Sequence, residues 1–440
     1  MAITILQQPT DYTPGGNFIV FIVGSTNVAQ PNFKYVANVS INGNMIAKLK
    51  AFPNPSNDDR AVFNVQELVR NFFDVIPRIG DGSIVPADTF ACDSQIASLQ
   101  VEFVEEYTGA PANSEESNLI TLWNGAFDVM EFAQWENVYA SKYRIETNPS
   151  SSFLTLPLTN RPESVRAIST PTYKQSGNIY FNCKSETTSN YDWTFYTYYT
   201  ADQSPYRQFA IKTPNWAPHN STPPELNDAQ MIGAPFMPFD VYNISASITS
   251  DGNAGSDSFP ENGGYYSVSA TESDEGGFKS IDYFVYLNED CSRFEPTEIH
   301  FENQLGAVDS YVFTKTNREV QTIERVQASK PYLNFNETGM FTQYGTPTNY
   351  SRFNAQVDFT RQYTASSDWL TDAEFEWLQE LVRSPRVWLR KAFETDEGVR
   401  EYLVPILITD TNYNVYKRDI DQLKTLSVTY RFTFDEATPL

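Results

Sequence analysis

Histidine and cysteine are scarce in this 440-residue chain, which has two histidines and three cysteines. Cys92, Cys183 and Cys291 stand far apart, so no pair has zinc-site spacing and the set forms no disulfide framework. We expect them to be small buried residues in a reducing compartment. A histidine-dependent catalytic triad is restricted to His219, in a proline-rich stretch, and His300, in an alternating strand. Neither lies near a Gly-x-Ser-x-Gly nucleophile motif, which argues against a triad.

Long hydrophobic runs are also missing. The longest apolar run covers residues 18–23, far short of the roughly 20 residues that span a bilayer. The start, MAITILQQPTDYTPGG, has no positive segment followed by an apolar core, as a signal peptide would have. The sequence therefore predicts a soluble chain that folds in the cytosol and has no membrane partner.

Basic residues are outnumbered, with 31 Lys and Arg against 55 Asp and Glu and a net charge of −24. Proteins that grip phosphate backbones need clustered basic side chains. The balance predicts no direct nucleic-acid binding and no docking on an anionic membrane, and it suits a well-solvated surface.

Aromatic residues and alternating patterns are abundant. The chain has 31 Phe and 26 Tyr, which suit pleated strands and protein interfaces. Strict alternation of apolar and polar residues appears in 98–104, 354–360 and 423–434, each with one apolar face that we expect to be buried. Turn signals such as PGG, INGN and ENGG separate such runs. The pattern predicts a mainly β fold, with several antiparallel β-sandwich modules in tandem and a few short helices.

Two helices are predicted. Residues 63–74 carry apolar residues at helical spacing, and residues 371–383 do so behind a capping box made by Thr371 and Glu374. Pro385 is expected to end the second helix. We divide the chain into an N-terminal β-sandwich module with a short helix (1–160), a middle β module (161–230), a loop-rich β section (231–293) and a C-terminal β module with the capped helix (294–440).

Candidate metal and cofactor sites are weak. Asp251, Asn253 and Asp257 offer oxygen ligands in a flexible loop, but the spacing fails the EF-hand pattern at Gly255 and Asn262. A solvated acidic loop is the better interpretation. No phosphate-binding glycine motif occurs either. We predict no metal, no cofactor and no enzymatic activity.

An aromatic cluster is the strongest candidate binding feature. Tyr191, Trp193, Tyr196 and Tyr198 lie close together and could stack on a saccharide. The competing interpretation is a strand with aromatic residues on both faces that a neighbouring module or subunit covers. A glycan hydrolase with paired carboxylates stays a third option, although nothing in the sequence singles out one pair.

The segment HFENQLGAVDSYVFT, residues 300–314, raises a structural question because it looks strand-like yet contains no catalytic pattern. We predict a sharp β-turn in which Leu305 and Val308 pack under the C-terminal module. Gly306 would supply a backbone shape that a Cβ atom resists.

Three stretches carry a resemblance to a known class of proteins. FENQLGAVDSYVF (301–313), residues 359–389 and residues 404–434 resemble, in this order, the C-terminal half of structural tail proteins of tailed bacteriophages. The most similar in style come from phages, including crAss-like ones, that infect Bacteroidota. Residues 18–73 are similar to the opening section of these proteins.

The resemblance implies a virion component in a ring around the tail tube, at the tail hub or in a baseplate layer. Its partners would be copies of itself in a ring and other tail or portal-proximal proteins. It would be made in the host cytoplasm and end in the virion tail. The alternative is a carbohydrate-binding or host-adhesion protein of the tail that uses the aromatic residues near Trp193.

Overall fold

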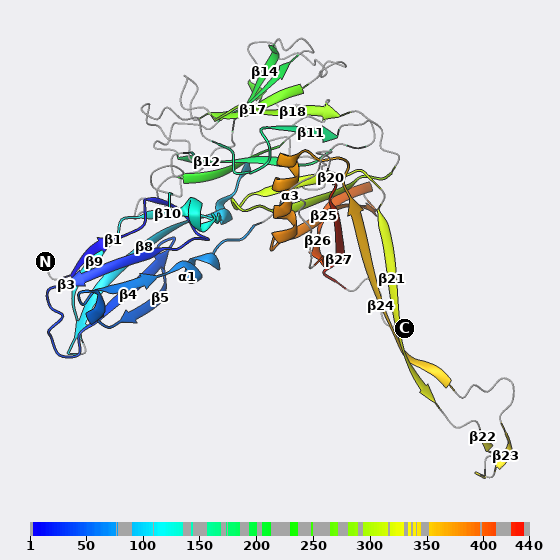
Figure 1. The fold of residues 1–440 in the computed structure, drawn as a ribbon, viewed down its shortest axis with the longest axis horizontal. Coiled ribbons are helices and arrows are strands. Elements are labelled where there is room, and N and C mark those ends of the chain that lie inside the picture. The colour runs from blue at the N-terminus through cyan, green and yellow to red at the C-terminus, as the bar shows by residue number, and fades with distance from the viewer. Residues whose placement is uncertain are drawn as a thin grey trace.

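The computed structural model describes residues 3–75, 77, 90–108, 110–134, 142–143, 156–168, 173, 175–184, 193–199, 205–212, 229–235, 248–249, 265–271, 280–288, 294–315, 317–329, 333–335, 338–339, 341–344, 352–396, 398–410 and 424–434. The described part is mainly β, which confirms the predicted fold class. Strands form several separate sheets, and helices are few and short (Figure 1).

The N-terminal region is a two-layered sandwich. One layer is a three-stranded sheet and the other a six-stranded sheet, and a single apolar core lies between them. The predicted alternation of 98–104 is confirmed, because Leu99, Val101 and Phe103 are fully buried in this core. The first sheet contains β1 (Ile3–Gln7), β3 (Val20–Ser25) and β6 (Ala61–Asn64); the second contains β2 (Tyr12–Pro14), β10 (Ile120–Trp123), β8 (Ile96–Tyr107), β4 (Lys34–Ile41), β5 (Asn44–Ala51) and β9 (Ala110–Glu116), which pairs with β8.

The first predicted helix is shorter than expected. Residues 61–64 continue as strand β6, which pairs with β3, so helix α1 covers only Gln66–Arg70. Residues 66–70 are helical, as predicted. Residues 63 and 64, which were expected to begin the helix, belong to strand β6 because they pair with β3. The other short helical segments here are α2 (Val129–Phe132) and the 3₁₀ turns η1 (Pro55–Asn57) and η2 (Asp93–Gln95).

The middle of the chain contributes two sheets that cross the predicted module borders. Strand β7 of the N-terminal region pairs with β15, and β11 pairs in parallel with β18. One sheet contains β12 (Asn178–Lys184), β15 (Ala229–Pro235) and β7 (Phe90–Ala91); the other contains β11 (Ser164–Ile168), β18 (Tyr283–Asn288), β17 (Tyr265–Thr271), β13 (Trp193–Tyr199), β14 (Pro205–Lys212) and β16 (Ile248–Thr249).

The C-terminal region is a seven-stranded sheet with helix α3 (Asp372–Arg383) packed on one face. The predicted capping box is confirmed: the Thr371 hydroxyl accepts from the Glu374 backbone N–H at 3.2 Å, and Glu374 accepts from the Thr371 N–H at 2.9 Å. The sheet order is β20 (Val308–Phe313), β19 (Thr297–Glu302), β25 (Val387–Thr395), β26 (Gly398–Ile408), β27 (Ser427–Phe432), β24 (Arg352–Ser366) and β21 (Arg318–Ser329).

Strands β21 and β24 extend far beyond the sheet as a two-stranded ribbon, which we call the arm (Figure 1). The short strands β22 (Leu333–Phe335) and β23 (Phe341–Tyr344) lie at its far end. The prediction that 354–360 buries one face is wrong, because Ala355 is exposed and Val357 and Phe359 are only partly covered. In contrast, the alternating residues Val428, Tyr430 and Phe432 are buried, as expected, and they lie beneath α3. The expectation is wrong for Phe434, the last residue of this face, which is 55% exposed.

Candidate functional site: a buried junction and a projecting arm

A tight turn joins β19 to β20 and lies where the N-terminal and C-terminal regions meet. Its Gly306 has a φ of +80°, a conformation that side chains with a Cβ rarely adopt. A Cβ added there would lie 1.3 Å from the backbone oxygen of Asn124. The predicted turn residues Leu305 and Gly306 therefore lie in a turn that allows another backbone to approach very closely.

The side chains around this turn form an apolar cluster that joins the two regions. Leu305 and Val308 are buried, and their cluster contains Trp388 of the predicted C-terminal module together with many residues from outside that module. Most of their neighbours come from the first 160 residues, because the turn points at the edge of the N-terminal sandwich. The buried members are Tyr12, Val75, Cys92, Trp123, Phe127, Tyr143, Leu158, Tyr180, Leu305, Ala307, Val308 and Trp388.

Hydrogen bonds fix the same contact. The Asn124 side-chain amide donates to the Glu302 carboxylate at 2.8 Å, and the Ala126 N–H donates to the Gln304 carbonyl at 2.8 Å. Burial raises the pKa of Glu302, and the hydrogen bond from Asn124 partly offsets this. The turn is thus attached to the N-terminal region by both backbone and side-chain bonds.

The segment 156–161, together with residues 175–176, covers the outer edge of β20. Asn303 donates to the Leu158 carbonyl at 2.8 Å, so the segment is bonded to the turn itself. The Asp309 carboxylate accepts from the Thr159 hydroxyl and from the Trp377 indole N–H, both at 2.8 Å. One buried carboxylate therefore connects this segment, strand β20 and helix α3.

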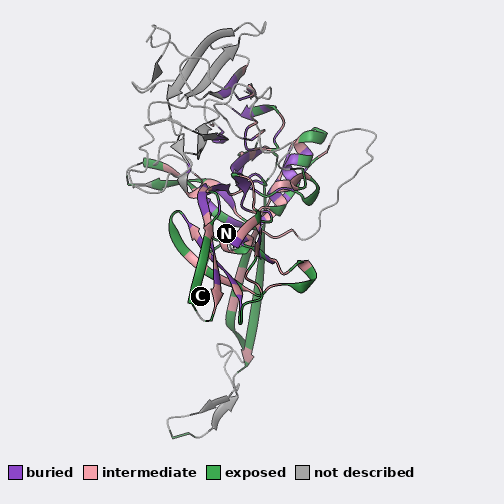
Figure 2. Ribbon diagram, turned by 90° about the vertical axis from the view of Figure 1, so that its left-hand side faces the viewer, coloured by how far each residue is buried: buried purple, intermediate pink, exposed green. Residues whose placement is uncertain are grey.

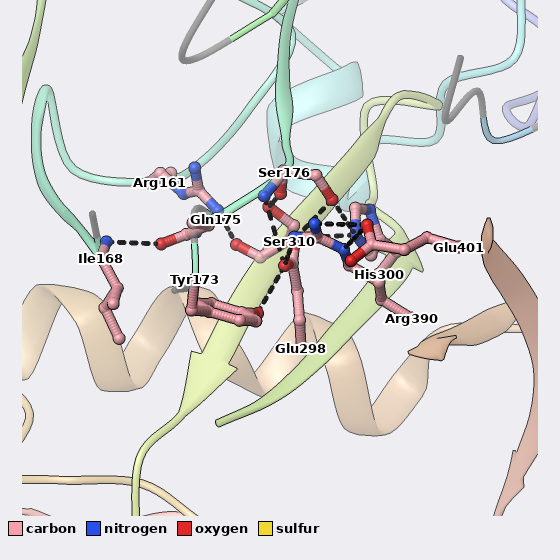
Figure 3. A network of polar contacts seen from close by, with 10 residues as sticks. All are labelled: Arg161, Ile168, Tyr173, Gln175, Ser176, Glu298, His300, Ser310, Arg390 and Glu401. Carbon is pink, nitrogen blue, oxygen red and sulfur yellow. Dashed lines mark hydrogen bonds and ion pairs between the residues drawn. The ribbon is translucent and has the colours of Figure 1, made fainter. Parts of the chain in front are cut away.

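A buried polar network lies on the sheet face opposite α3 (Figure 3). Its centre is Glu298, which is 1% exposed. This carboxylate accepts from the Tyr173 hydroxyl at 2.7 Å, the Ser176 hydroxyl at 2.7 Å, His300 Nε2 at 2.9 Å and Arg390 Nη1 at 2.7 Å. The Ser176 backbone N–H donates a further bond at 3.2 Å. Five donors therefore surround one carboxylate, which compensates for its burial.

Further contacts extend the network in two directions. Arg390 of β25 also donates from Nε to Glu401 at 2.7 Å. It therefore bridges two carboxylates on the strands that flank β25, Glu298 on β19 and Glu401 on β26. On the other side, Ser310 donates to the Ser176 carbonyl at 3.0 Å and accepts through its own carbonyl from Arg161. The guanidinium of Arg161 stacks 4.3 Å from the ring centroid of Trp377. These contacts hold Arg161, Tyr173 and Ser176 against the sheet.

The residue types Ser176, His300 and Glu298 invite comparison with a catalytic triad. In a triad the serine and the acid contact opposite nitrogens of the imidazole, so that one nitrogen can take the serine proton while the acid holds the N–H of the other. Here the Ser176 hydroxyl, at 3.3 Å, and Glu298, at 2.9 Å, both face His300 Nε2. All three residues are also buried. The geometry suits a structural connection between segments and does not suit a catalytic triad.

The charge of Glu298 is stabilised by its partners. Burial alone would raise its pKa, but the hydrogen bond and charge interaction with His300, the nearby charge of Arg390 and the bond from Tyr173 outweigh it. The net result is a pKa lowered to about 2. The carboxylate is therefore ionised at neutral pH and acts as a fixed anionic anchor.

A second carboxylate, Glu380, attaches helix α3 to the same turn. Its pKa is raised, whereas that of Glu298 is lowered. Glu380 accepts from the Gln304 N–H at 2.8 Å and from the Asn160 side-chain amide at 2.7 Å. Burial raises its pKa to about 7; the Gln304 N–H acts against this rise, whereas the charge of Asp309 adds to it. Glu380 therefore titrates in the neutral range.

The predicted aromatic site is described only in its backbone. Trp193, Tyr196 and Tyr198 lie in β13, which pairs with β14 and β17, so they belong to an internal strand of their sheet. Their side chains, together with Tyr191, His219 and the loop from Asp251 to Asp257, lie outside the described residues. Carbohydrate binding stays a prediction, to be tested on a glycan array with Trp193→Ala.

Sequence reasoning missed the network because its members are far apart in the chain; Ser176 and Glu298 are separated by 122 positions. One local signal was present. In residues 298–302, Glu298, His300 and Glu302 alternate with Ile299 and Phe301. Three ionisable residues on one strand face, opposite a purely apolar face, indicate a strand with a buried polar side.

The arm is the main exposed feature of the described residues (Figure 2). All residues of β21 are exposed except Ala328, which is partly exposed. Several are apolar, and Val326 is 55% exposed. Strand β21 is also the last strand of its sheet, so one of its edges has no strand partner within the described ranges.

Within the described residues, no group of three or more His, Cys, Asp or Glu side chains could hold a metal ion. No helix in that part of the chain is both long and apolar enough to cross a bilayer. No protein-family model matches the sequence. A search of curated proteins likewise finds no match.

Proposed function

We propose that this chain is a non-enzymatic structural protein of a bacteriophage tail, in a ring, hub or baseplate layer. It would assemble by packing β modules against its own copies and against other tail proteins. The proposal takes its biological setting from the resemblance of residues 18–73, 301–313, 359–389 and 404–434 to tail structural proteins. Its physical support comes from the arm.

The exposure of the arm is the main structural support for the proposal. A two-stranded ribbon is marginally stable in water, because neither face is covered and its backbone bonds compete with solvent. The arm nevertheless exposes Val320, Ile323, Val326 and Phe353. Long exposed edge strands with apolar residues are aggregation sites unless a partner covers them. A surface of this kind is suited to contact with another subunit.

The junction supports the same interpretation. The turn at Gly306 and the Asp309 contacts join the C-terminal sheet to residues of the N-terminal region, and the Glu298 network attaches Tyr173 and Ser176 to the same sheet. A subunit that contacts two layers of an assembly needs rigid internal contacts of this kind, because they keep its binding surfaces at fixed relative positions. These groups are used to hold segments together, and their geometry provides no open reaction centre.

Deleting the arm tests the proposal. Replacing residues 323–359 with Asn-Gly closes a two-residue hairpin on the Thr322–Thr360 pair and leaves the sheet intact. We expect the variant to fold with a nearly unchanged Tm but to be missing from phage particles when it replaces the natural chain. Val129→Thr, which changes an apolar side chain that is 71% exposed on α2, is the control and should be incorporated normally. Normal incorporation of the arm-deleted chain would contradict the proposal.

A further inference from the structure

One face of the C-terminal sheet continues beyond helix α3 as a mixture of basic and aromatic side chains. Lys391 Nζ lies 4.9 Å from the ring centroid of Phe432, which in turn stacks on Phe434 at 5.4 Å. Arg361 lies 4.9 Å above the ring of Phe359. We call this surface the cation–aromatic face and define it by Phe359, Arg361, Lys391, Phe393, Tyr402 and Phe434.

Strand register extends this face. Residues directly opposite each other in an antiparallel pair share a face, as do residues two apart in one strand. Arg325 is opposite Val357, two residues from Phe359, and Arg400 is opposite Phe393. The same rule puts one acidic residue, Glu319, on this part of the face, 3.6 Å from Arg361. Basic side chains therefore predominate on it.

A basic face is unusual in this chain, which has a net charge of −24. Basic and aromatic side chains together are common at the centres of protein interfaces. Their electrostatic complement is an acidic surface. The net negative charge of the chain repels nucleic acid, so a phosphate backbone is an unfavourable partner for the basic face. A second copy of the same chain is a better candidate, because its surface carries an excess of carboxylates.

Strands β8 and β9 offer a matching acidic surface. Glu102 and Glu116 lie directly opposite each other in the register, and like charges in this arrangement destabilise a sheet. Lys48 lies on the same face, but Asn38 on the strand between separates it from Glu102. The hydrogen bonds of the two carboxylates come from neutral amides: Asn38 donates to Glu102 at 2.9 Å and Gln100 donates to Glu116 at 3.3 Å. Lys50 is already paired with Glu106 at 2.7 Å.

These two surfaces cannot meet within one molecule. Strand β9 lies at the N-terminal end of the structure, and the arm projects from the opposite end (Figure 1). A contact between them therefore joins different copies, and it joins unlike surfaces. Such head-to-tail contacts generate closed rings when the rotation between copies closes, and filaments when it does not.

We propose that the cation–aromatic face of one copy docks on the Glu102–Glu116 surface of a second copy, head to tail. This inference deepens the proposed function and rests on it, because it assigns the surfaces through which copies of the subunit meet.

Charge-swap variants test this pairing by sedimentation velocity over a range of concentrations and salt. The wild-type chain should self-associate, with weaker association at high salt. The double variants Arg325→Glu/Lys391→Glu and Glu102→Lys/Glu116→Lys should each associate about tenfold more weakly or worse. An equimolar mixture of the two should regain association, because each reversed surface again faces an opposite charge. Arg318→Glu, an exposed change on the opposite face of the arm, should behave as wild type.

Three outcomes would overturn the inference: a wild-type chain that stays monomeric throughout, double variants that associate normally, or a mixture that shows no recovery. Binding of a single-stranded DNA oligonucleotide that depends on Lys391, without self-association, would overturn it in favour of a nucleic-acid surface. Circular dichroism and Tm confirm that each variant is folded. Detection of the chain in phage particles is independent of these results, so failure of the docking inference can be distinguished from failure of the proposed function.

Discussion

At the scale of single residues, the junction depends on groups that have few acceptable replacements. Gly306 combines a positive φ with a neighbouring backbone that leaves no space for a Cβ. Glu298 is a buried carboxylate whose charge is balanced by donors from three segments of the chain. Both residues stabilise contacts between regions that are distant in sequence.

Gly306→Ala should strongly destabilise the protein. The added Cβ meets the Asn124 carbonyl and also occupies a strained φ, so we expect a loss of about 3 kcal/mol or more in the free energy of unfolding. Gly43→Ala is the matched control, because Gly43 has a φ of +75° but nothing within 4 Å of the added atom. It should lose only about 1 kcal/mol. Equal losses in urea denaturation would show that the close approach at Gly306 has no energetic role.

Glu298→Gln should remove a pH dependence at acidic pH. The folded-state pKa of Glu298 is about 2 and its ordinary value is 4.5, so the folded protein binds this proton less tightly than the unfolded chain. The stabilisation is present above pH 4.5 and is lost as pH falls towards 2. The variant should be less stable by about 3 kcal/mol at neutral pH, since Arg390 loses a charged partner, and its stability should fall less on acidification. Parallel stability curves for both proteins from pH 5 to 2 would contradict this assignment.

At the scale of elements, local sequence patterns predicted helix α3 and one strand of the arm, but they did not predict the exposure of the arm. The capping box and apolar stripe of α3 were predictable because both depend on residues within one helix. The alternation in 354–360 predicted a strand correctly but not its burial, because alternation records two unlike faces and does not reveal what covers them. For the arm, the described residues provide no cover. In our account another subunit supplies it.

Glu380→Gln should change the pH dependence of the free energy of unfolding near neutral pH. Because the pKa of Glu380 is raised to about 7 from 4.5, the folded state binds its proton more tightly than the unfolded chain. This contribution is fully present below pH 4.5 and is lost as pH rises through 7. The variant should therefore be more stable than wild type above pH 7 and should lack this part of the pH dependence. Denaturation between pH 5 and 8 measures it, and an unchanged pH dependence in the variant would refute it.

At the scale of the whole molecule, the sequence predicted a mainly β chain but could not predict how its sheets meet. The Glu298 network draws on Tyr173 and Ser176 from one stretch of the chain and on Arg390 from another, and no spacing rule links these stretches to Glu298. The turn at Leu305 was recognisable from Gly306, whereas its packing against Trp123 depends on the placement of a distant sandwich. Long-range contacts of this kind require the three-dimensional arrangement.

We propose that this chain is a repeated structural subunit of a phage tail. Quantitative mass spectrometry of purified phage particles tests it most directly. We expect the chain to be present in several copies per particle, in a fixed ratio to other tail proteins. Particles that are complete and infectious but contain none of this chain would contradict it.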